Sequence, residues 1–285
     1  MSRSLDHIVH AVRDLDAAAD FYRRIGFTVG ARNRHPWGTH NCIVQFPGFF
    51  IEILTLAEPD KLADDGFSRM FGAFNGDFIK KHEGFSVLLL ESRDAAADEK
   101  AFRERGIAAS SAMKFEREGK RPDGSLVKLA FSLVFARDPL APQTGFAVCQ
   151  HHFPENFWNP AFQKHANGVT GMSGAIFVAE NPTDHHIFMS AYTGVRDLQS
   201  TSSGIAIATP HGEIQIMDPT AHRIHFGIEP PSVSAGMRLC ALRFAASDLK
   251  ILEASLKAGD AGHSHHLGRI VVAPAEAMGA ALVFE

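Results

Sequence analysis

The chain has 285 residues, of which 45% are hydrophobic and 21% charged, an ordinary composition for a globular protein with room for two domains. Its formal net charge is −4, and lysine and arginine are scattered along it, so no basic face for a nucleic-acid backbone is indicated. Residues 1–12 lack the features of a signal peptide, and no run of about eighteen apolar residues occurs. We therefore expect a cytoplasmic protein that has neither nucleic acid nor a membrane as a partner.

An internal repeat organises the chain. Residues 10–27 align without gaps on residues 90–107, and weaker copies occupy residues 175–195 and 240–259. In each copy an apolar strand leads to a polar turn, then to a helix with apolar residues at helical spacing, then to a glycine that can end the helix.

Strand-like runs also follow each predicted helix. After the first helix they cover residues 27–34, 40–46 and 49–56, and the later copies close with runs at 145–151, 211–218 and 279–285. The repeated unit is therefore a strand, a helix and three strands. Four such units begin near residues 5, 85, 172 and 237, and a segment with proline and asparagine, residues 152–168, separates the second unit from the third. We predict an α+β protein of four βαβββ modules paired into two domains, residues 1–155 and 169–285.

Glu52 is out of place in the apolar run that covers residues 49–56. An unpaired charge in a buried strand costs several kcal/mol, so the carboxyl group has to be neutral, paired with a cation or bound to a metal ion. An ion pair with Arg32 or Arg34 of the nearby loop is one solution from within this chain. The three cysteines, Cys42, Cys149 and Cys240, lie in separate apolar segments and are expected to be buried thiols.

The opening motif LDHIVHAVRDLDAAADFYRRIGF, together with the closing strand FFIEILTL, resembles the vicinal oxygen chelate superfamily. That superfamily includes glyoxalase I, extradiol ring-cleaving dioxygenases and bleomycin-resistance proteins. The resemblance covers almost the whole chain and is greatest to the glyoxalase-like branch, in which the first domain carries a loop that reads RHPWGTHN here, residues 34–41.

The resemblance implies a metal site in the first module. The family pattern gives His7 and Glu52 as ligands of a divalent ion such as Zn, Fe, Mn, Ni or Co, and it makes Glu52 the candidate catalytic residue. Alternation along a strand places His7 and His10 on opposite faces, so only one of them can face Glu52, and we favour His7.

The second module departs from the family pattern. Val87 and Cys149 occupy the positions that correspond to His7 and Glu52. His151 lies two residues after Cys149 on the same strand face, and we predict it as the third metal ligand. The alternative is that His151 is a surface residue leading into the linker.

Polar and aromatic residues of the loop predict a substrate rim at the cavity mouth. His40 and Asn41 are neighbours on a strand and cannot both point inward. The tract GHSHH, residues 262–266, resembles a metal-binding sequence, but its glycine neighbours favour a solvated loop. The predicted substrate-binding residues are Arg34, His35, Trp37, Thr39, His40 and Asn41.

The second domain has no comparable ligand set. Its closing strands carry Gln215 and Val283 where a glutamate would be needed. We expect this half to support the fold, close over the cavity or mediate assembly, for example as a homodimer.

These features predict a glyoxalase-like enzyme that uses a divalent metal ion and acts on a substrate with adjacent oxygens, by lyase, isomerase or dioxygenase chemistry. The rival prediction is a metal-free protein of the bleomycin-resistance kind that sequesters a small molecule. No motif supports a third class, a regulatory module that acts through a protein partner.

Overall fold

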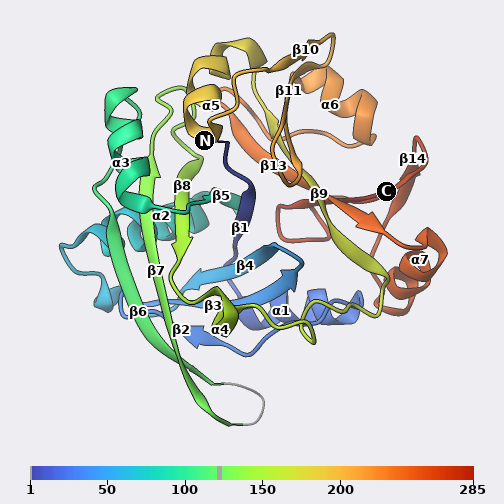
Figure 1. Ribbon diagram of the computed structural model, residues 1–285. Helices are drawn as coiled ribbons and strands as arrows, with labels where there is room; N and C mark the ends of the chain where they lie inside the picture. The colour runs from blue at the N-terminus through green and yellow to red at the C-terminus, as the bar shows by residue number, and fades with distance from the viewer. Residues whose placement is uncertain (1, 121–123) are drawn as a thin grey trace.

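Two eight-stranded sheets dominate the computed structural model, which describes residues 2–120 and 124–285 (Figure 1). The first sheet has the order β2-β3-β4-β1-β5-β8-β7-β6. Its strands are β1 Leu5–Ala11, β2 Asn33–Arg34, β3 Thr39–Phe46, β4 Phe49–Leu56, β5 Gly84–Glu91, β6 Met113–Lys120, β7 Leu126–Ala136 and β8 Gly145–His151.

The second sheet repeats this arrangement in the order β10-β11-β12-β9-β13-β16-β15-β14. Its strands are β9 Val169–Val178, β10 Gln199–Thr201, β11 Gly204–Ala208, β12 Glu213–Met217, β13 Arg238–Ala246, β14 Ser264–His266, β15 Arg269–Val272 and β16 Ala281–Phe284.

The helices complete four βαβββ modules, and the predicted α+β class is confirmed. In each module the first strand runs parallel to the last, and β1 meets β5 antiparallel just as β9 meets β13. The module helices are α1 Leu15–Arg24, α3 Ala95–Glu104, α5 His186–Thr193, which follows the 3₁₀ turn Pro182–His185, and α7 Leu249–Ala258. No helix among the described residues is long and apolar enough to cross a membrane.

The repeated motif at the start of α1 and α3 has a direct physical role. Asp14 accepts hydrogen bonds from the backbone of the first turn of α1, and Asp94 does the same for α3. These caps satisfy amide groups that have no partner inside the helix. After α1, Gly26 adopts a φ of +87°, which glycine tolerates more readily than other residues.

Two features differ from the sequence-based expectation. The strand predicted over residues 27–34 is reduced to Asn33–Arg34. An insertion between β4 and β5 contains a 3₁₀ turn Pro59–Lys61, a π-helical segment η2 Ser68–Ala73 and helix α2 Phe74–Lys81. Two further short helices are α4 Pro154–Phe157 and α6 Pro219–Phe226.

Each sheet is apolar on both faces. Alternation along β5 sends Leu88 and Leu90 into a large core cluster that contains residues of both sheets and of α1, α3, α5 and α7. Val87 and Leu89 point the other way, into a smaller cluster on the inner face of the first sheet. The shared cluster joins the two halves of the chain, so the division into domains 1–155 and 169–285 stays a prediction.

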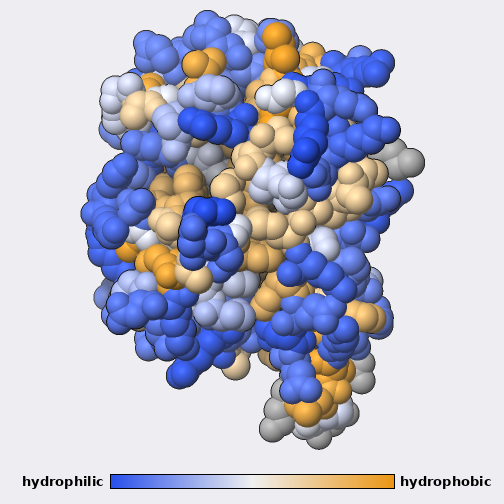
Figure 2. Space-filling model, turned by 90° about the vertical axis from the view of Figure 1, so that its left-hand side faces the viewer, coloured by the Kyte–Doolittle hydropathy of each residue, from blue (hydrophilic) through white to orange (hydrophobic). Residues whose placement is uncertain are grey.

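The inner faces of the two sheets are covered differently. Helix α6 packs Ala221 and Phe226 onto the inner face of the second sheet. On the first sheet, η2 and the long β6–β7 hairpin lie over the inner face (Figure 1), and the side of the molecule seen in Figure 2 is largely hydrophilic with apolar patches. The candidate site lies beneath this cover.

Candidate functional site

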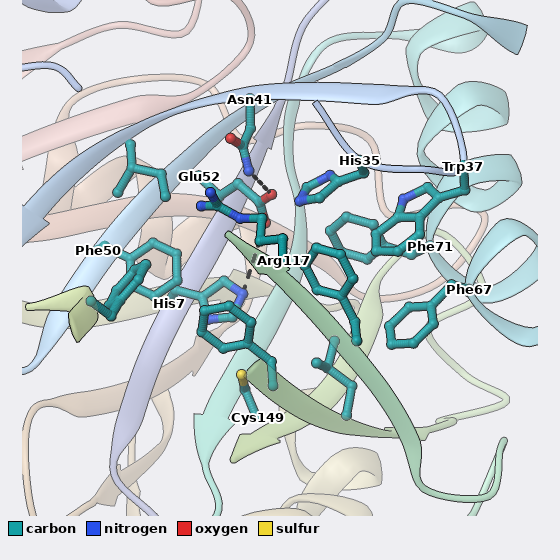
Figure 3. A pocket seen from close by; sticks show the side chains of 15 residues that line it. His7, His35, Trp37, Asn41, Phe50, Glu52, Phe67, Phe71, Arg117 and Cys149 are labelled. Atoms are coloured by element: carbon teal, nitrogen blue, oxygen red, sulfur yellow. Dashed lines mark hydrogen bonds and ion pairs between the residues drawn. The ribbon is translucent and has the colours of Figure 1, made fainter. Parts of the chain in front are cut away.

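An aromatic cavity of about 70 Å³ lies against the inner face of the first sheet (Figure 3). Strands β1, β3, β4 and β8 supply one wall, and η2 with the β6–β7 hairpin supplies the other. Its lining residues are His7, His35, Trp37, Asn41, Ile43, Phe50, Glu52, Phe67, Phe71, Phe115, Arg117, Phe131, Leu133, Cys149 and Phe157. The mostly apolar lining with a few convergent polar groups is typical of a small-molecule site.

The polar groups converge on Glu52, whose side chain is only 6% exposed. Asn41 Nδ2 donates a hydrogen bond of 2.5 Å to Glu52 Oε1, and Glu52 Oε2 lies 3.9 Å from His7 Nε2 (Figure 3). Burial raises the pKa of Glu52, and the nearby His7, Asn41 and Arg117 oppose that rise. Glu52 is therefore a carboxyl group that can exchange a proton more readily than an exposed glutamate near neutral pH.

Asp6 holds His7 in place from behind. The pairing of β1 with β5 shifts between Leu5 and His7, which leaves Asp6 as the extra residue of a β-bulge. Asp6 Oδ2 lies 2.5 Å from His7 Nδ1, and Asp6 Oδ1 lies 3.1 Å from His151 Nε2. Burial alone would raise the pKa of Asp6, but the two imidazoles hold it well below its usual range. An ionised Asp6 only accepts hydrogen bonds, so Nδ1 of His7 carries a proton and Nε2 faces the cavity.

Residues 5–193 match the sequence model of the glyoxalase-like domain. This chain belongs to the glyoxalase-like domain family. The resemblance to the vicinal oxygen chelate superfamily is confirmed by this match and by the fold. No curated protein sequence matches the chain.

Solved structures share the fold over almost the entire chain. A hypothetical protein from Staphylococcus aureus is 14% identical with a TM-score of 0.68, and the match covers 99% of both chains. A mutant 4-hydroxymandelate synthase from Streptomyces coelicolor is 10% identical with a TM-score of 0.59, over 99% of this chain and 91% of that one. The Mn(II)-bound glyoxalase from Novosphingobium aromaticivorans is 12% identical with a TM-score of 0.56, over 100% of this chain and 82% of that one. Identities this low establish the common fold and nothing finer.

The first-module residues of this glyoxalase-like protein fit a divalent ion. The 3.9 Å between His7 Nε2 and Glu52 Oε2 is too long for a hydrogen bond. Two ligands on one tetrahedral ion, with bonds of roughly 2.0 to 2.2 Å each, lie about 3.4 Å apart, so a small inward shift of either side chain would let both bind one ion. A carboxylate that accepts from the other ring nitrogen, as Asp6 does for His7, is the usual support of a metal-bound histidine.

Cys149 is a further potential donor beside His7. Potential ligand atoms of Asp6, His7 and Cys149 lie within 4.8 Å of one another. Burial raises the pKa of the Cys149 thiol well above its usual value, and the neighbouring Asp6 and Glu52 raise it further. Cys149 would therefore be a thiol unless a bound ion displaced its proton. Val87, at the other matching position of the second module, offers no donor.

His151 reaches the site through Asp6. Its ring stacks on Trp158, with 5.6 Å between centroids, and meets the edges of Phe131 and Phe157. His151 lies on the same strand face as Cys149, as expected. It is separated from the cavity by the aromatic wall and does not line the cavity. Neither His151 nor Glu52 belongs to a group of three potential ligand atoms within 4.8 Å among the described residues. Ligation by His151 stays a prediction, and the contact that the structure shows is with Asp6.

The predicted substrate rim divides into two groups. His35, Trp37 and Asn41 line the cavity, and Thr39 supports His35 through a contact of 2.9 Å between its hydroxyl and Nδ1. Burial lowers the pKa of His35 to about 3, so His35 is neutral near pH 7.

The remaining rim residues point away from the cavity. His40 lies on the opposite strand face from Asn41, and its Nε2 is 2.8 Å from Glu58. Arg34 is exposed, and Arg32 pairs with Asp16 at 2.7 Å, so the arginine that acts on Glu52 comes from neither position. It is Arg117 of β6.

Three parts of the site were missed in the sequence. Asp6 was overlooked because strict alternation would turn it away from His7, and a bulge leaves no clear mark in the sequence. Arg117 lies in the charged stretch MKFEREGK, where alternation with Phe115 was the available signal. Phe67 and Phe71 are four residues apart, a helical spacing that pointed to η2.

Proposed function

We propose that this chain is a divalent-metal-dependent enzyme of the glyoxalase-like kind that acts on a small substrate with an apolar body and two neighbouring oxygens. The observation that carries the proposal is the convergence of His7, Asn41, Glu52 and Arg117 in an otherwise aromatic cavity. Lyase, isomerase and dioxygenase chemistry are all compatible with that arrangement.

The lining suits this substrate class. Trp37 stacks between His35 and Phe67, with 4.7 Å between centroids on either side, and forms a flat apolar wall. An apolar or aromatic group can bury itself there and exclude water. Arg117 and Asn41 are donors that can receive the oxygens of the substrate beside Glu52.

His7 and Glu52 would hold the ion, and Cys149 is a further potential donor beside His7. When bound, the ion supplies Lewis-acid polarisation of a substrate carbonyl or enediolate. Asn41 fixes Glu52 Oε1 and leaves Oε2 directed at the cavity. Glu52, the candidate catalytic residue, would take a proton from a carbon next to the polarised carbonyl group and return it.

A second candidate is a metal-free binding protein. The observation in its favour is that Val87 provides no ligand, while Glu52 already has Asn41 and Arg117 as polar neighbours. In this alternative, Asn41 and Arg117 compensate the buried Glu52 carboxyl group, and no ion is needed. Cytoplasmic location and a homodimer also stay predictions, which fractionation and light scattering would test.

Metal analysis separates the two candidates. Protein purified without chelator, and apoprotein reconstituted in turn with Fe(II), Mn(II), Zn(II), Ni(II) and Co(II), should bind an ion in the cavity. Glu52→Gln should abolish that tight binding and leave the melting temperature nearly unchanged, because volume is kept and only the charge is lost. Glu58→Gln, outside the cavity, is the matched control. Equal metal binding by Glu52→Gln and its parent would favour the binding protein.

A further inference from the structure

A second cluster of ligand-type side chains lies on the other half of the molecule. Glu253 of α7 faces two histidines: His263, just before β14, and His265, within β14. Their potential ligand atoms all lie within 4.8 Å of one another. Figure 1 places α7 and β14 at the right-hand side of the molecule, whereas the cavity strands β6, β7 and β8 are at the left.

Strand geometry explains why the two histidines meet the same carboxylate. His263 and His265 are two positions apart, so their side chains project to one side, and β14 pairs with β15 to fix their direction. Nε2 of His265 lies 3.4 Å from Glu253 Oε1, and Nε2 of His263 lies 3.8 Å from the same oxygen. His266, the next residue after His265, points to the opposite side of the strand, and its Nε2 donates to the carbonyl of Ile224 at 2.7 Å.

His263 presents a lone pair to this carboxylate. Its Nδ1 lies 2.9 Å from the carbonyl oxygen of Ala261, which can only accept, so Nδ1 carries the proton. In the neutral ring Nε2 is then an acceptor, and it faces a second acceptor, Glu253 Oε1. A cation or a proton between two such acceptors would stabilise the arrangement. A ring anchored by a carbonyl on its other nitrogen is also the usual arrangement of a metal-bound histidine.

In this structure a lysine pairs with the Glu253 carboxylate. Lys257 Nζ lies 2.6 Å from Glu253 Oε1, one helical turn along α7. The Glu253 carboxylate therefore already holds one cation, which a metal ion could replace. The Lys257 side chain is 66% exposed and can turn into solvent without losing a buried contact.

We propose that Glu253, His263 and His265 form a second metal site for a borderline-soft divalent ion of the Zn²⁺, Ni²⁺ or Cu²⁺ class. Two imidazoles and one carboxylate are a ligand set for these ions, whereas Mg²⁺ and Ca²⁺ prefer oxygen ligands alone. Water completes the coordination, since His265 is 63% exposed. The ion connects α7 to β14, which is the last strand of its sheet, and stabilises that edge.

Zinc titration of the full chain, stripped of metal beforehand, tests this site. The readouts are the number of Zn²⁺ equivalents bound in competition with a chromophoric chelator and the melting temperature with and without Zn²⁺. His265→Ala should lose one equivalent, or bind it at least tenfold more weakly, and should lose the thermal shift due to that ion. Mg²⁺ should produce no shift at this site.

Two further variants make the result specific. His266→Ala removes a neighbouring imidazole from the opposite side of β14 and should keep both the equivalent and the shift. Lys257→Gln removes the competing cation and should tighten Zn²⁺ binding several-fold. The site is ruled out if His265→Ala and His266→Ala bind the same number of equivalents with the same affinity, or if Lys257→Gln weakens binding. Cavity binding does not interfere, because none of these residues lies near His7.

Discussion

At the scale of single residues, Asp6 determines how His7 can act. It is buried, ionised and in contact with two imidazoles, one of which faces the cavity while the other packs among aromatic rings. Consecutive strand residues normally point to opposite faces. The bulge in β1 allows the side chains of Asp6 and His7 to lie on the same side and to contact each other. His151 contributes by sharing the Asp6 carboxylate, which it reaches from β8.

Replacing Asp6 by Asn should therefore weaken metal binding in the cavity 10- to 100-fold, the usual range when the partner of a metal-bound histidine is changed. Asn keeps the size of the side chain but removes the charge that fixes the proton on His7 Nδ1. Reconstitution titrations of the purified variant measure the effect. Asp98→Asn, which removes a carboxylate that pairs with Arg3 elsewhere, should bind metal as the parent does. Unchanged affinity in Asp6→Asn would show that Asp6 does not support a metal ligand.

Alternation along strands was sufficient to predict some of the site and not the rest. It accounts for Asn41 pointing inward while His40 points outward, and for His7 facing Glu52 while His10 does not. It could not locate His151 along β8 relative to the cavity, because that depends on where Phe131 and Phe157 end the wall. Alternation along a strand predicts the face on which a side chain lies, but tertiary packing decides which groups that side chain contacts.

At the scale of elements, the β6–β7 hairpin is the part of the first sheet that encloses the cavity. It contributes Phe115 and Arg117 from β6 and Phe131 and Leu133 from β7. The stretch MKFEREGK appears solvated because its outward residues are charged, as an edge strand requires to avoid pairing with another chain. The alternate residues Phe115 and Arg117 point inward and cover the cavity.

Phe115→Ala should open this cover. The Phe115 ring meets Trp37 at 5.0 Å and His35 at 5.6 Å between centroids, so its loss leaves a gap beside the indole. We expect Trp37 to become more accessible to acrylamide and the stability to fall by about 1 to 3 kcal/mol, less than for a fully buried Phe. Fluorescence quenching in a Trp158→Phe background measures Trp37 alone, since the chain has two tryptophans.

Leu126→Ala is the matched control on the same hairpin. Leu126 is 64% exposed, so its replacement should change stability by no more than about 0.5 kcal/mol and leave the quenching of Trp37 as it was. If Phe115→Ala and Leu126→Ala gave the same quenching, the hairpin would not be what shields Trp37.

At the scale of the whole molecule, the repeat was the feature that made the fold predictable. Four copies of one pattern imply four equivalent units, and modules of this kind bury their apolar faces by pairing. The way the pairs meet was not visible in the sequence. Tyr192 of α5 donates from its hydroxyl toward the carbonyls of Leu88 at 2.7 Å and Ala147 at 2.9 Å, and so joins the second half to the first sheet. Such contacts depend on how the second half packs against the first sheet, which the repeat pattern does not specify.

Two histidines lie at or near this junction, His10 fully buried and His165 partly buried. Nε2 of His10 on β1 donates to the carbonyl of Met278 in the second half, at 3.0 Å, and Nδ1 lies 3.0 Å from the Tyr22 hydroxyl. Nε2 of His165, in the connecting segment, donates to the carbonyl of Gln45 at 3.0 Å. Burial lowers the pKa of His10 and of His165 to about 4. Both residues are therefore neutral in the folded protein at pH values where free histidine takes up a proton.

This difference predicts that acid weakens the packing of the two halves. In the unfolded chain, histidine binds a proton below its ordinary pKa of about 6.5, whereas in the folded chain it does so only below about pH 4. The free energy of unfolding therefore falls as the pH decreases from 6.5 to 4. His10 alone contributes at most about 1.4 kcal/mol per pH unit. Urea unfolding at pH 7.5, 6.5, 5.5 and 4.5 measures the slope. His10→Gln does not titrate and should show a shallower slope between pH 6.5 and 4.5, although it is less stable at pH 7.5. Identical slopes for the variant and the parent would mean that His10 takes up its proton without unfolding of the junction.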